Sequence, residues 1–183
     1  MIRKAKPEDV NVIVELMMLA MGDLPYKFVA AEDKQKAFAL LKLFVLQEGN
    51  QYSLDNTFVD EQDGKVVGAI NAYDGGQIEN LRKPFFHYLR EHFHNGNFEM
   101  ELESESGEFY IDTVAVDPKQ QGKGIGKNLI IEVINHAKSL NFHKVGLLVS
   151  NPDAKRLYEK LGFEKVGSRN LLGKTHEHLV FRV

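Results

Sequence analysis

The amino-acid sequence predicts one domain of the α/β class (α+β mixed sheet) over residues 1–183. Of the 183 residues, 43% are hydrophobic and 27% are charged, as is typical of a single globular domain. Two β-rich runs flank Asp63-Gly64, a dipeptide that favours a tight antiparallel hairpin. In the second half the expected order is strand, helix, strand, helix, strand, strand, so helices and strands should share one core.

Composition excludes several classes of function. The chain has no cysteine, which excludes a disulfide framework, a thiolate zinc site and a cysteine nucleophile. Its formal net charge is −3, so it lacks the basic character of a nucleic-acid-binding domain. No apolar run reaches the about 18 residues of a transmembrane helix, and Glu8, Asp9 and Asn11 interrupt the first apolar stretch. We therefore expect a cytoplasmic protein with neither a membrane nor a nucleic-acid partner.

The spacing of apolar residues predicts the elements of the N-terminal half. Pro7 suits the first turn of a helix, because its missing N–H would be unpaired there anyway. From Val10 to Met21 apolar residues recur in steps of three and four, which predicts a helix that Gly22 ends. The other elements expected here are a strand over residues 2–5, a helix over residues 32–48 and strands over Thr57–Asp60 and Lys65–Tyr73.

Residues 74–107 separate this half from the next. Residues 77–94 carry a helical apolar period, which Pro84 should kink or weaken. Phe98–Glu105 alternates between apolar and acidic residues, which predicts a strand with one solvated face. The acidic residues of that face are Glu99, Glu101, Glu103 and Glu105. They could attract a cationic amine or a basic peptide, or protect an edge strand from aggregation.

The C-terminal half begins with a β-rich run over Glu108–Val116. A helix is expected over residues 124–140, because apolar residues recur there on one side. Lys144–Val149 is nearly all apolar, as buried strands are. The remaining expected elements are a short helix over residues 152–161 and strands over Phe163–Val166 and Glu177–Val183.

The most informative segment is the turn that follows Val116. Gly122, Gly124 and Gly126 stand at alternate positions and lead into an amphipathic helix. Glycine lets backbone N–H groups face a ligand without an intervening Cβ, and a helix N-terminus adds unpaired donors and a positive dipole end. The turn therefore suits a phosphate or pyrophosphate, with Lys123 and Lys127 adding charge. A glycine turn that binds nothing is the alternative.

Two motifs resemble the GNAT family of N-acetyltransferases. Gln121-Gly122-Lys123-Gly124-Ile125-Gly126 matches the family signature of Arg or Gln, two residues, Gly, one residue, and Gly or Ala. Asn151–Phe163 resembles the family segment Asn-x-x-Ala-x-x-x-Tyr-x-x-x-Gly-Phe. The resemblance is tight over residues 108–167, and over residues 2–73 it rests only on the order of elements. Residues 74–107 depart from the usual pattern as an insertion.

The resemblance implies a GNAT-like acyl-CoA N-acyltransferase fold. Such a fold has a central mixed, mostly antiparallel sheet flanked by helices, here with an inserted helical segment at about 74–98. It also implies acetyl-CoA as the co-substrate, with the strand before the turn pairing with the pantetheine arm. The residues that it assigns to acetyl-CoA are Val114, Ala115, Val116, Gln121, Gly122, Lys123, Gly124, Ile125, Gly126, Lys127 and Asn151. Asn151 has a second interpretation as the N-cap of the helix that begins at Pro152.

The reaction that the resemblance implies is direct attack of a primary amine on the thioester. Tyr158 is carried over as the proton donor to the leaving sulfur, and a core tyrosine is its alternative. By a period of two we expect one strand face to carry Glu108, Tyr110, Asp112, Val114 and Val116. On that face Asp112 would lie one step from Val114, where it could bind the ammonium or take its proton. Glu108 or water are the alternatives for the base.

Several features stay open at this point. The acceptor is a small-molecule or peptide amine of undetermined identity, and a homodimer is neither required nor excluded. One rival function is a non-catalytic acyl-CoA-binding sensor or regulatory module, which Tyr158 and Asp112 together disfavour. A second is a nucleotide-phosphate regulator, which a competition between acetyl-CoA and ATP would distinguish. No metal site is expected, because His87 and His92 are five residues apart and so miss a common helical face. We expect the insertion to cover the acceptor end of the cleft, because it directly precedes the strand of Asp112.

Overall fold

The computed structural model describes residues 1–93 and 98–183 of the chain. Its strands are β1 (Ile2–Lys4), β2 (Thr57–Gln62), β3 (Lys65–Asp74), β4 (Phe109–Val116), β5 (Lys144–Val149), β6 (Glu164–Leu171) and β7 (Lys174–Arg182). Its α-helices are α1 (Val10–Met21), α2 (Leu24–Phe28), α3 (Lys34–Leu46), α4 (Ile78–His92), α5 (Ile125–Ser139) and α6 (Pro152–Lys160). None of the helices in these described ranges has the length and apolar character needed to cross a membrane.

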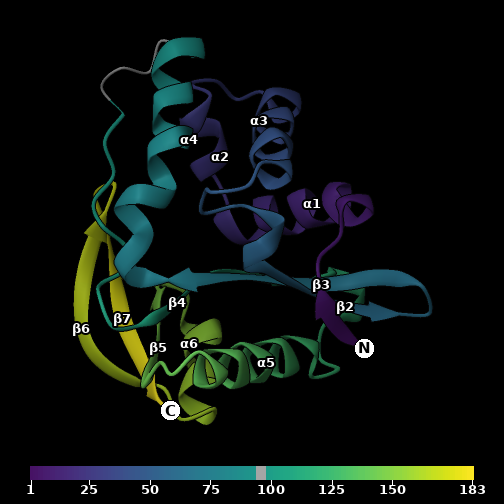
Figure 1. Cartoon of the computed structure of the whole chain (residues 1–183), viewed down its shortest axis with the longest axis vertical. Helices are drawn as coiled ribbons and strands as arrows, with labels where there is room; N and C mark the ends of the chain where they lie inside the picture. The colour runs from purple at the N-terminus through teal and green to yellow at the C-terminus, as the bar shows by residue number, and fades with distance from the viewer. Residues whose placement is uncertain (94–97) are drawn as a thin grey trace.

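The strands of the described residues form one mixed sheet in the order β1-β2-β3-β4-β5-β7-β6. Strands β4 and β5 pair in parallel, and every other neighbouring pair is antiparallel. Figure 1 shows α1 to α4 on one side of this sheet and α5 and α6 on the other. The expected mixed, mostly antiparallel sheet between helices is therefore confirmed.

Most expected elements of the N-terminal half form where turn chemistry indicated them. Asp63 and Gly64 have φ angles of 50° and 73°, the left-handed conformation that a tight hairpin between β2 and β3 needs. Helix α1 ends at Gly22, and Asp33 caps α3 by accepting a hydrogen bond from the Lys36 N–H. The short helix α2 was not expected. It starts with Leu24-Pro25, which fits the preference of proline for a first helical turn.

The last two strands are longer than their apolar runs predict. Strand β6 continues through a polar stretch to Leu171, and β7 already starts at Lys174. Leu172 and Gly173 turn the chain with φ angles of 48° and 79°, so the two strands pair up to the tip of the hairpin. Ladder hydrogen bonds thus override the polar composition of this stretch.

Helix α4 of the insertion is part of the main core. The Phe85 ring lies edge-on to Phe28 and Phe44, both at 4.9 Å between centroids, and to Tyr52 at 5.0 Å. Phe85 is fully buried, and it packs in one cluster with α1 and α3. Pro84 lies inside α4, so it does not prevent the helix from forming. The helix ends at His92, and residue 94 of the expected helix lies outside the described residues.

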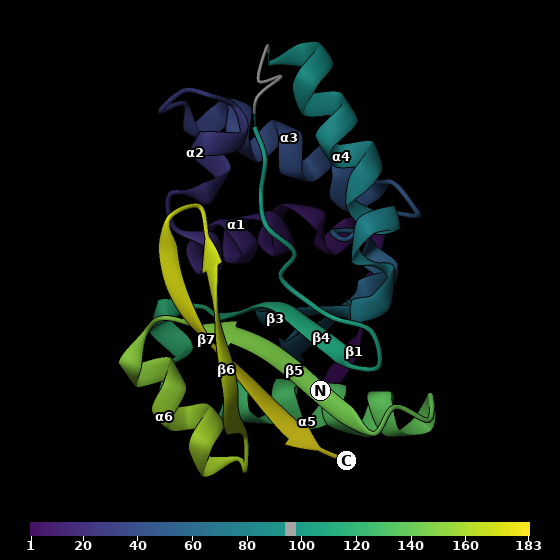
Figure 2. The same cartoon turned by 90° about the vertical axis from the view of Figure 1, so that its left-hand side faces the viewer.

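The strand expected over Phe98–Glu105 does not form, and this prediction is wrong. These residues run back to the sheet as an extended segment between α4 and the β6–β7 hairpin (Figure 2). From α4, Arg82 donates to the Met100 and Glu101 carbonyl oxygens, and from β6, Arg169 donates to the Leu102 carbonyl oxygen. Because these carbonyl oxygens accept hydrogen bonds from arginine side chains, they need no hydrogen bonds from a neighbouring strand.

The prediction that all four acidic residues of this segment are solvated is also wrong. Glu99, Glu101 and Glu105 are exposed, but Glu103 is only 7% exposed. A segment without strand pairing does not have to alternate its side chains between two faces, so the period of two says nothing about Glu103 here.

A β-bulge in β4 corrects the expectation that five alternate residues share one face. Asn71 of β3 pairs with Thr113, and Ala72 pairs with Ile111, so Asp112 is an extra residue without a partner in this ladder. The extra residue changes the phase of the strand. Tyr110 therefore packs against Tyr73 and α4, whereas Val114 and Val116 pack into the core beneath α5.

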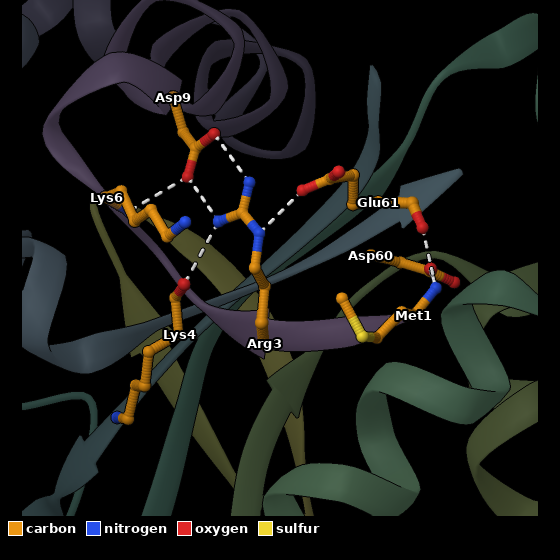
Figure 3. A network of polar contacts seen from close by, with 7 residues as sticks. All are labelled: Met1, Arg3, Lys4, Lys6, Asp9, Asp60 and Glu61. Atoms are coloured by element: carbon orange, nitrogen blue, oxygen red, sulfur yellow. Dashed lines mark hydrogen bonds and ion pairs between the residues drawn. The ribbon is translucent and has the colours of Figure 1, made fainter. Parts of the chain in front are cut away.

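A network around Arg3 joins the N-terminus to the sheet (Figure 3). The Arg3 guanidinium donates to both carboxylate oxygens of Asp9, at 2.7 and 3.0 Å, and its Nε donates to Glu61 at 2.7 Å. The hydrogen bond and charge of Arg3 lower the pKa of Asp9. Because Asp9 is buried, it depends on this cation to remain ionised.

Candidate functional site

A cleft of about 860 Å³ opens where β4 and β5 separate. The two strands pair only from Phe109 to Ile111, although β4 continues to Val116. Past this point β3 still pairs with one edge of β4, while β5 pairs with β7. Among the described residues no strand pairs with the other edge of β4 there, so its N–H and C=O groups face the cleft.

The glycine turn forms one end of the cleft. Gly122 and Gly124 both have φ of 79°, a conformation that residues with a side chain rarely adopt. Apart from the glycine itself and its two neighbours in the chain, no described residue has an atom within 4 Å of the Cβ position of either. Gly124 is the N-cap of α5, and the Asn128 N–H makes the first helical bond, to the Gly124 carbonyl oxygen. The preceding N–H groups of the first turn therefore lack helical acceptors and supply the donors that an anion needs.

The structure brings together nearly all residues assigned to acetyl-CoA from the sequence. Those that line the cleft are Val114, Ala115, Val116, Gln121, Gly122, Gly124, Ile125, Gly126, Lys127 and Asn151. Lys123 does not line the cleft, and its ammonium donates to Gln120 Oε1 at 2.6 Å. Asn151 Oδ1 accepts from the Asp153 and Ala154 N–H groups, so the N-cap role is present.

Tyr158 lies on α6 at the wall of the cleft. The side chain is 8% exposed and its ring packs against Phe163. Burial raises the pKa of Tyr158 to about 12, so the hydroxyl keeps its proton at neutral pH. Among the described residues this hydroxyl has no hydrogen-bond partner, and it is thus available to a group bound in the cleft.

Asp112 lies on the wall of the cleft at the bulge of β4. Its Oδ2 accepts from the Tyr73 hydroxyl at 2.7 Å and from Gln51 Nε2 at 3.4 Å. Burial raises the pKa of Asp112 to about 6, and these two hydrogen bonds offset part of that effect. Asp112 is therefore an oriented carboxylate that can take up and release a proton near neutral pH.

Glu103 is a cleft residue that the sequence analysis named only as one of four acidic residues. It lines the same cleft, and its Oε1 is buried without a hydrogen-bond partner among the described residues. Burial raises the pKa of Glu103 well above its ordinary value, the charge of Asp112 raises it further, and Arg82 lowers it. Four glutamates at alternate positions carried no signal that would single out this one.

Glu108, the alternative base, lies elsewhere. Its side chain is fully buried, accepts from His178 Nε2 at 2.8 Å and from the Glu105 N–H at 3.0 Å, and does not line the cleft. A side chain on Gly146 would overlap the Glu108 carboxylate, so a glycine in β5 makes room for it. Through its hydrogen bonds to the Glu105 N–H and to His178, Glu108 joins the end of the insertion to β7.

The other walls of the cleft come from both ends of the chain. Leu19, Met21 and Leu24 line it from α1 and α2, and Leu171 and His176 line it from the β6–β7 hairpin. Among the described residues no group of three or more potential ligands could hold a metal ion. The cleft thus combines a glycine turn with free N–H donors, an unpaired strand edge, the buried carboxyl group of Glu103 and the half-buried carboxyl group of Asp112.

Sequence and structure comparisons agree with this geometry. The sequence model of the family described as "Acetyltransferase (GNAT) family" matches residues 25–163, well over half of the chain. A mycothiol acetyltransferase from Acidothermus cellulolyticus is 30% identical over 145 residues, which make up 76% of this chain. The chain spans only 39% of the length of that relative.

Solved structures match over the whole chain. A crystal structure described as an acetyltransferase is 27% identical and has a TM-score of 0.81, covering 100% of this chain and 99% of its own. The N-acetyltransferase from Staphylococcus aureus Mu50 has the same fold, with a TM-score of 0.84 at 23% identity, covering 99% of this chain and 100% of its own. The chain therefore belongs to the GNAT acetyltransferase family.

Proposed function

We propose that the protein is an acetyl-CoA-dependent N-acetyltransferase that transfers the acetyl group to a primary amine by direct attack. One observation carries the proposal: a single cleft runs from the anion-binding turn, along the unpaired edge of β4, to the carboxylate of Asp112. A phosphate-bearing thioester and an amine can therefore meet on one strand.

The residues present fit acetyl-CoA. The open positions at Gly122 and Gly124 and the first-turn N–H groups of α5 would hold its pyrophosphate, and the free edge of β4 would pair with its pantetheine arm. Gln121 braces the turn by donating to the Val116 carbonyl oxygen at 3.4 Å. When bound, acetyl-CoA supplies the thioester carbonyl that the amine attacks.

Asp112 is the proposed base. A carboxylate with a pKa of about 6 can accept a proton from an ammonium at neutral pH and release it again to water. Tyr73 and Gln51 hold one oxygen in place, which leaves Oδ1 for the acceptor. Glu108 is less suited, because its carboxylate is occupied by His178 and the Glu105 N–H.

Tyr158 is the proposed proton donor to the leaving sulfur. As the C–N bond forms and the C–S bond breaks, its hydroxyl gives a proton to the sulfur and later regains one from water. The amine nitrogen gives up its protons to Asp112 and water, so free CoA, the amide and one proton are the net products. This chemistry needs no covalent enzyme intermediate, in keeping with a chain that has no cysteine.

The proposed acceptor is a small-molecule or peptide amine, the proposed compartment is the cytoplasm, and the cleft as described is formed by one chain. A panel containing ethylamine, putrescine, phenethylamine and an alanyl peptide amide should be incubated with acetyl-CoA. Free CoA is detected with a thiol reagent, to which the protein adds no background because it has no cysteine. Mass spectrometry should then show the acetylated amine.

The rival functions give different results in the same experiment. A non-catalytic acyl-CoA-binding module would bind acetyl-CoA in calorimetry but release no CoA with any amine. A nucleotide-phosphate regulator would bind ATP in preference to acetyl-CoA. Either result would refute the proposed enzyme.

A further inference from the structure

We propose that Glu103 and Asp112 form one binding site for the ammonium group of the acceptor, so that the enzyme selects amines that are cationic when they enter. This inference rests on the proposed function. It adds the charge state in which the acceptor binds and names Glu103 as the residue that distinguishes cationic from neutral acceptors. Glu103 comes from the insertion, and no family motif assigns it a role.

The first support is an unsatisfied acceptor atom. Glu103 is only 7% exposed, lines the cleft, and has a buried Oε1 without a partner among the described residues. Such an atom is costly unless a donor meets it in the working complex. An ammonium group has three N–H donors, and it can therefore bridge Glu103 and Asp112 while donating its third bond elsewhere.

The second support is that the segment around Glu103 is fixed on both sides. Before it, the carbonyl oxygens of Met100 and Glu101 accept from Arg82 at 2.9 and 3.1 Å. After it, Ser104 Oγ donates to the Gly75 carbonyl oxygen at 2.8 Å, and Arg169 donates to Glu105 at 2.7 Å. These bonds hold Glu103 in position although no helix or strand contains it.

The third support is electrostatic. The charge of Asp112 raises the pKa of Glu103, so the pair resists full ionisation while no cation is bound to it. The side chains that face the pair from β3, β4 and the loop before β2 are Tyr73, Tyr110, Tyr52 and Gln51, none of which is a cation. From α4, Arg82 also acts on Glu103, but its guanidinium donates to backbone carbonyl oxygens. An incoming ammonium would supply the missing positive charge.

The test compares Glu103→Gln with Glu99→Gln. Both replace a carboxyl group of the same segment by an amide, but Glu99 is exposed and outside the cleft lining. With the best acceptor of the panel we expect KM for the amine to rise about 10- to 100-fold in Glu103→Gln, while KM for acetyl-CoA stays within about twofold. Glu99→Gln should leave both constants unchanged.

A second readout isolates charge from size. Ethylamine and 2,2,2-trifluoroethylamine have similar shapes, but only ethylamine is mainly protonated at neutral pH. The native enzyme should prefer ethylamine in kcat/KM at pH 7, and Glu103→Gln should lose most of that preference. Equal amine kinetics for Glu103→Gln and Glu99→Gln would overturn the inference and leave the proposed function standing.

If no amine of the panel is acetylated, a binding measurement that needs no turnover still tests the ammonium site. That outcome would refute the proposed function, but the cation site can still be examined by carboxyl ¹³C NMR with methylammonium chloride. A methylammonium-dependent shift of the Asp112 carboxyl carbon that disappears in Glu103→Gln and persists in Glu99→Gln supports the site. No shift of the Glu103 carboxyl carbon in the native protein overturns it.

Discussion

Adding a negative charge at Gly126 should weaken acetyl-CoA binding without disturbing the fold. Gly126 lies in the first turn of α5 and lines the cleft. A Cβ there would lie 3.6 Å from Val116 Cγ2, an ordinary contact, and no positive φ stands in the way of a side chain. Gly122 and Gly124 are poorer sites for this test, because at φ of 79° any side chain strains the backbone.

The expected loss follows from Coulomb repulsion. A carboxylate at position 126 would lie about 5 Å from a pyrophosphate held at the helix N-terminus, which costs about 1 kcal/mol in a water-like environment and about 3 kcal/mol at a partly buried surface. These energies correspond to an about 5- to 150-fold higher Kd. Added salt should reduce the loss, because it screens exposed charges.

Calorimetric titration of Gly126→Glu and Gly126→Gln with acetyl-CoA measures this effect. The two variants have side chains of nearly equal size and differ in charge, so their ratio of Kd isolates the repulsion. Gly126→Ala is the control for backbone effects, since alanine is allowed at the last position of the signature and favours a helix. Circular dichroism should show native folding for all three. Equal Kd values for the Glu and Gln variants at low salt would refute the placement of the pyrophosphate.

Three further predictions concern the proposed catalytic groups and the N-terminal network. Tyr158→Phe keeps the ring but removes the proton donor, so kcat should fall about 10²- to 10⁴-fold with KM for acetyl-CoA unchanged; an unaltered kcat, with chemistry rate-limiting, would leave Tyr158 a packing residue. The rate of the native enzyme should fall as pH drops through about 6, where Asp112 becomes protonated. The rate of Asp112→Asn should not show this fall near pH 6, and it should recover at high pH, where more of the amine is neutral. If the variant still shows the fall near pH 6, Asp112 is excluded as the base. Arg3→Met should lower the free energy of unfolding by about 2–3 kcal/mol at pH 7, because it leaves the buried Asp9 without its cation. Since Arg3 lowers the pKa of Asp9 in the folded state, its contribution is present above the unfolded pKa of about 3.9 and is lost as pH falls through the folded pKa. The difference between the urea midpoints of the two proteins should therefore be smaller at pH 3 than at pH 7, and an equal difference at both pH values would contradict this reasoning.

Local sequence by itself determined the features that depend on neighbouring residues. The hairpin at Asp63-Gly64 and the turn at Gly122 and Gly124 require left-handed backbone, which few residue types adopt, so composition reveals them. Helix α5 and the cap of α6 at Asn151 likewise follow from apolar period and capping chemistry. These are also the parts that carry the family motifs, which is why the sequence could predict the glycine turn at one end of the cleft.

Only the tertiary structure decided the end of the cleft at Asp112, where we propose that the acceptor binds. One extra residue in β4 turns Val114 away from the face of Tyr110, and the bulge that does this is visible only in the pairing with β3. Glu103 comes to line the cleft because Arg82 and Arg169, distant in sequence, donate to the backbone carbonyl oxygens of its segment. Side-chain period can predict orientation only where a regular ladder or helix fixes it, and at this end of the cleft long-range contacts replace that regularity.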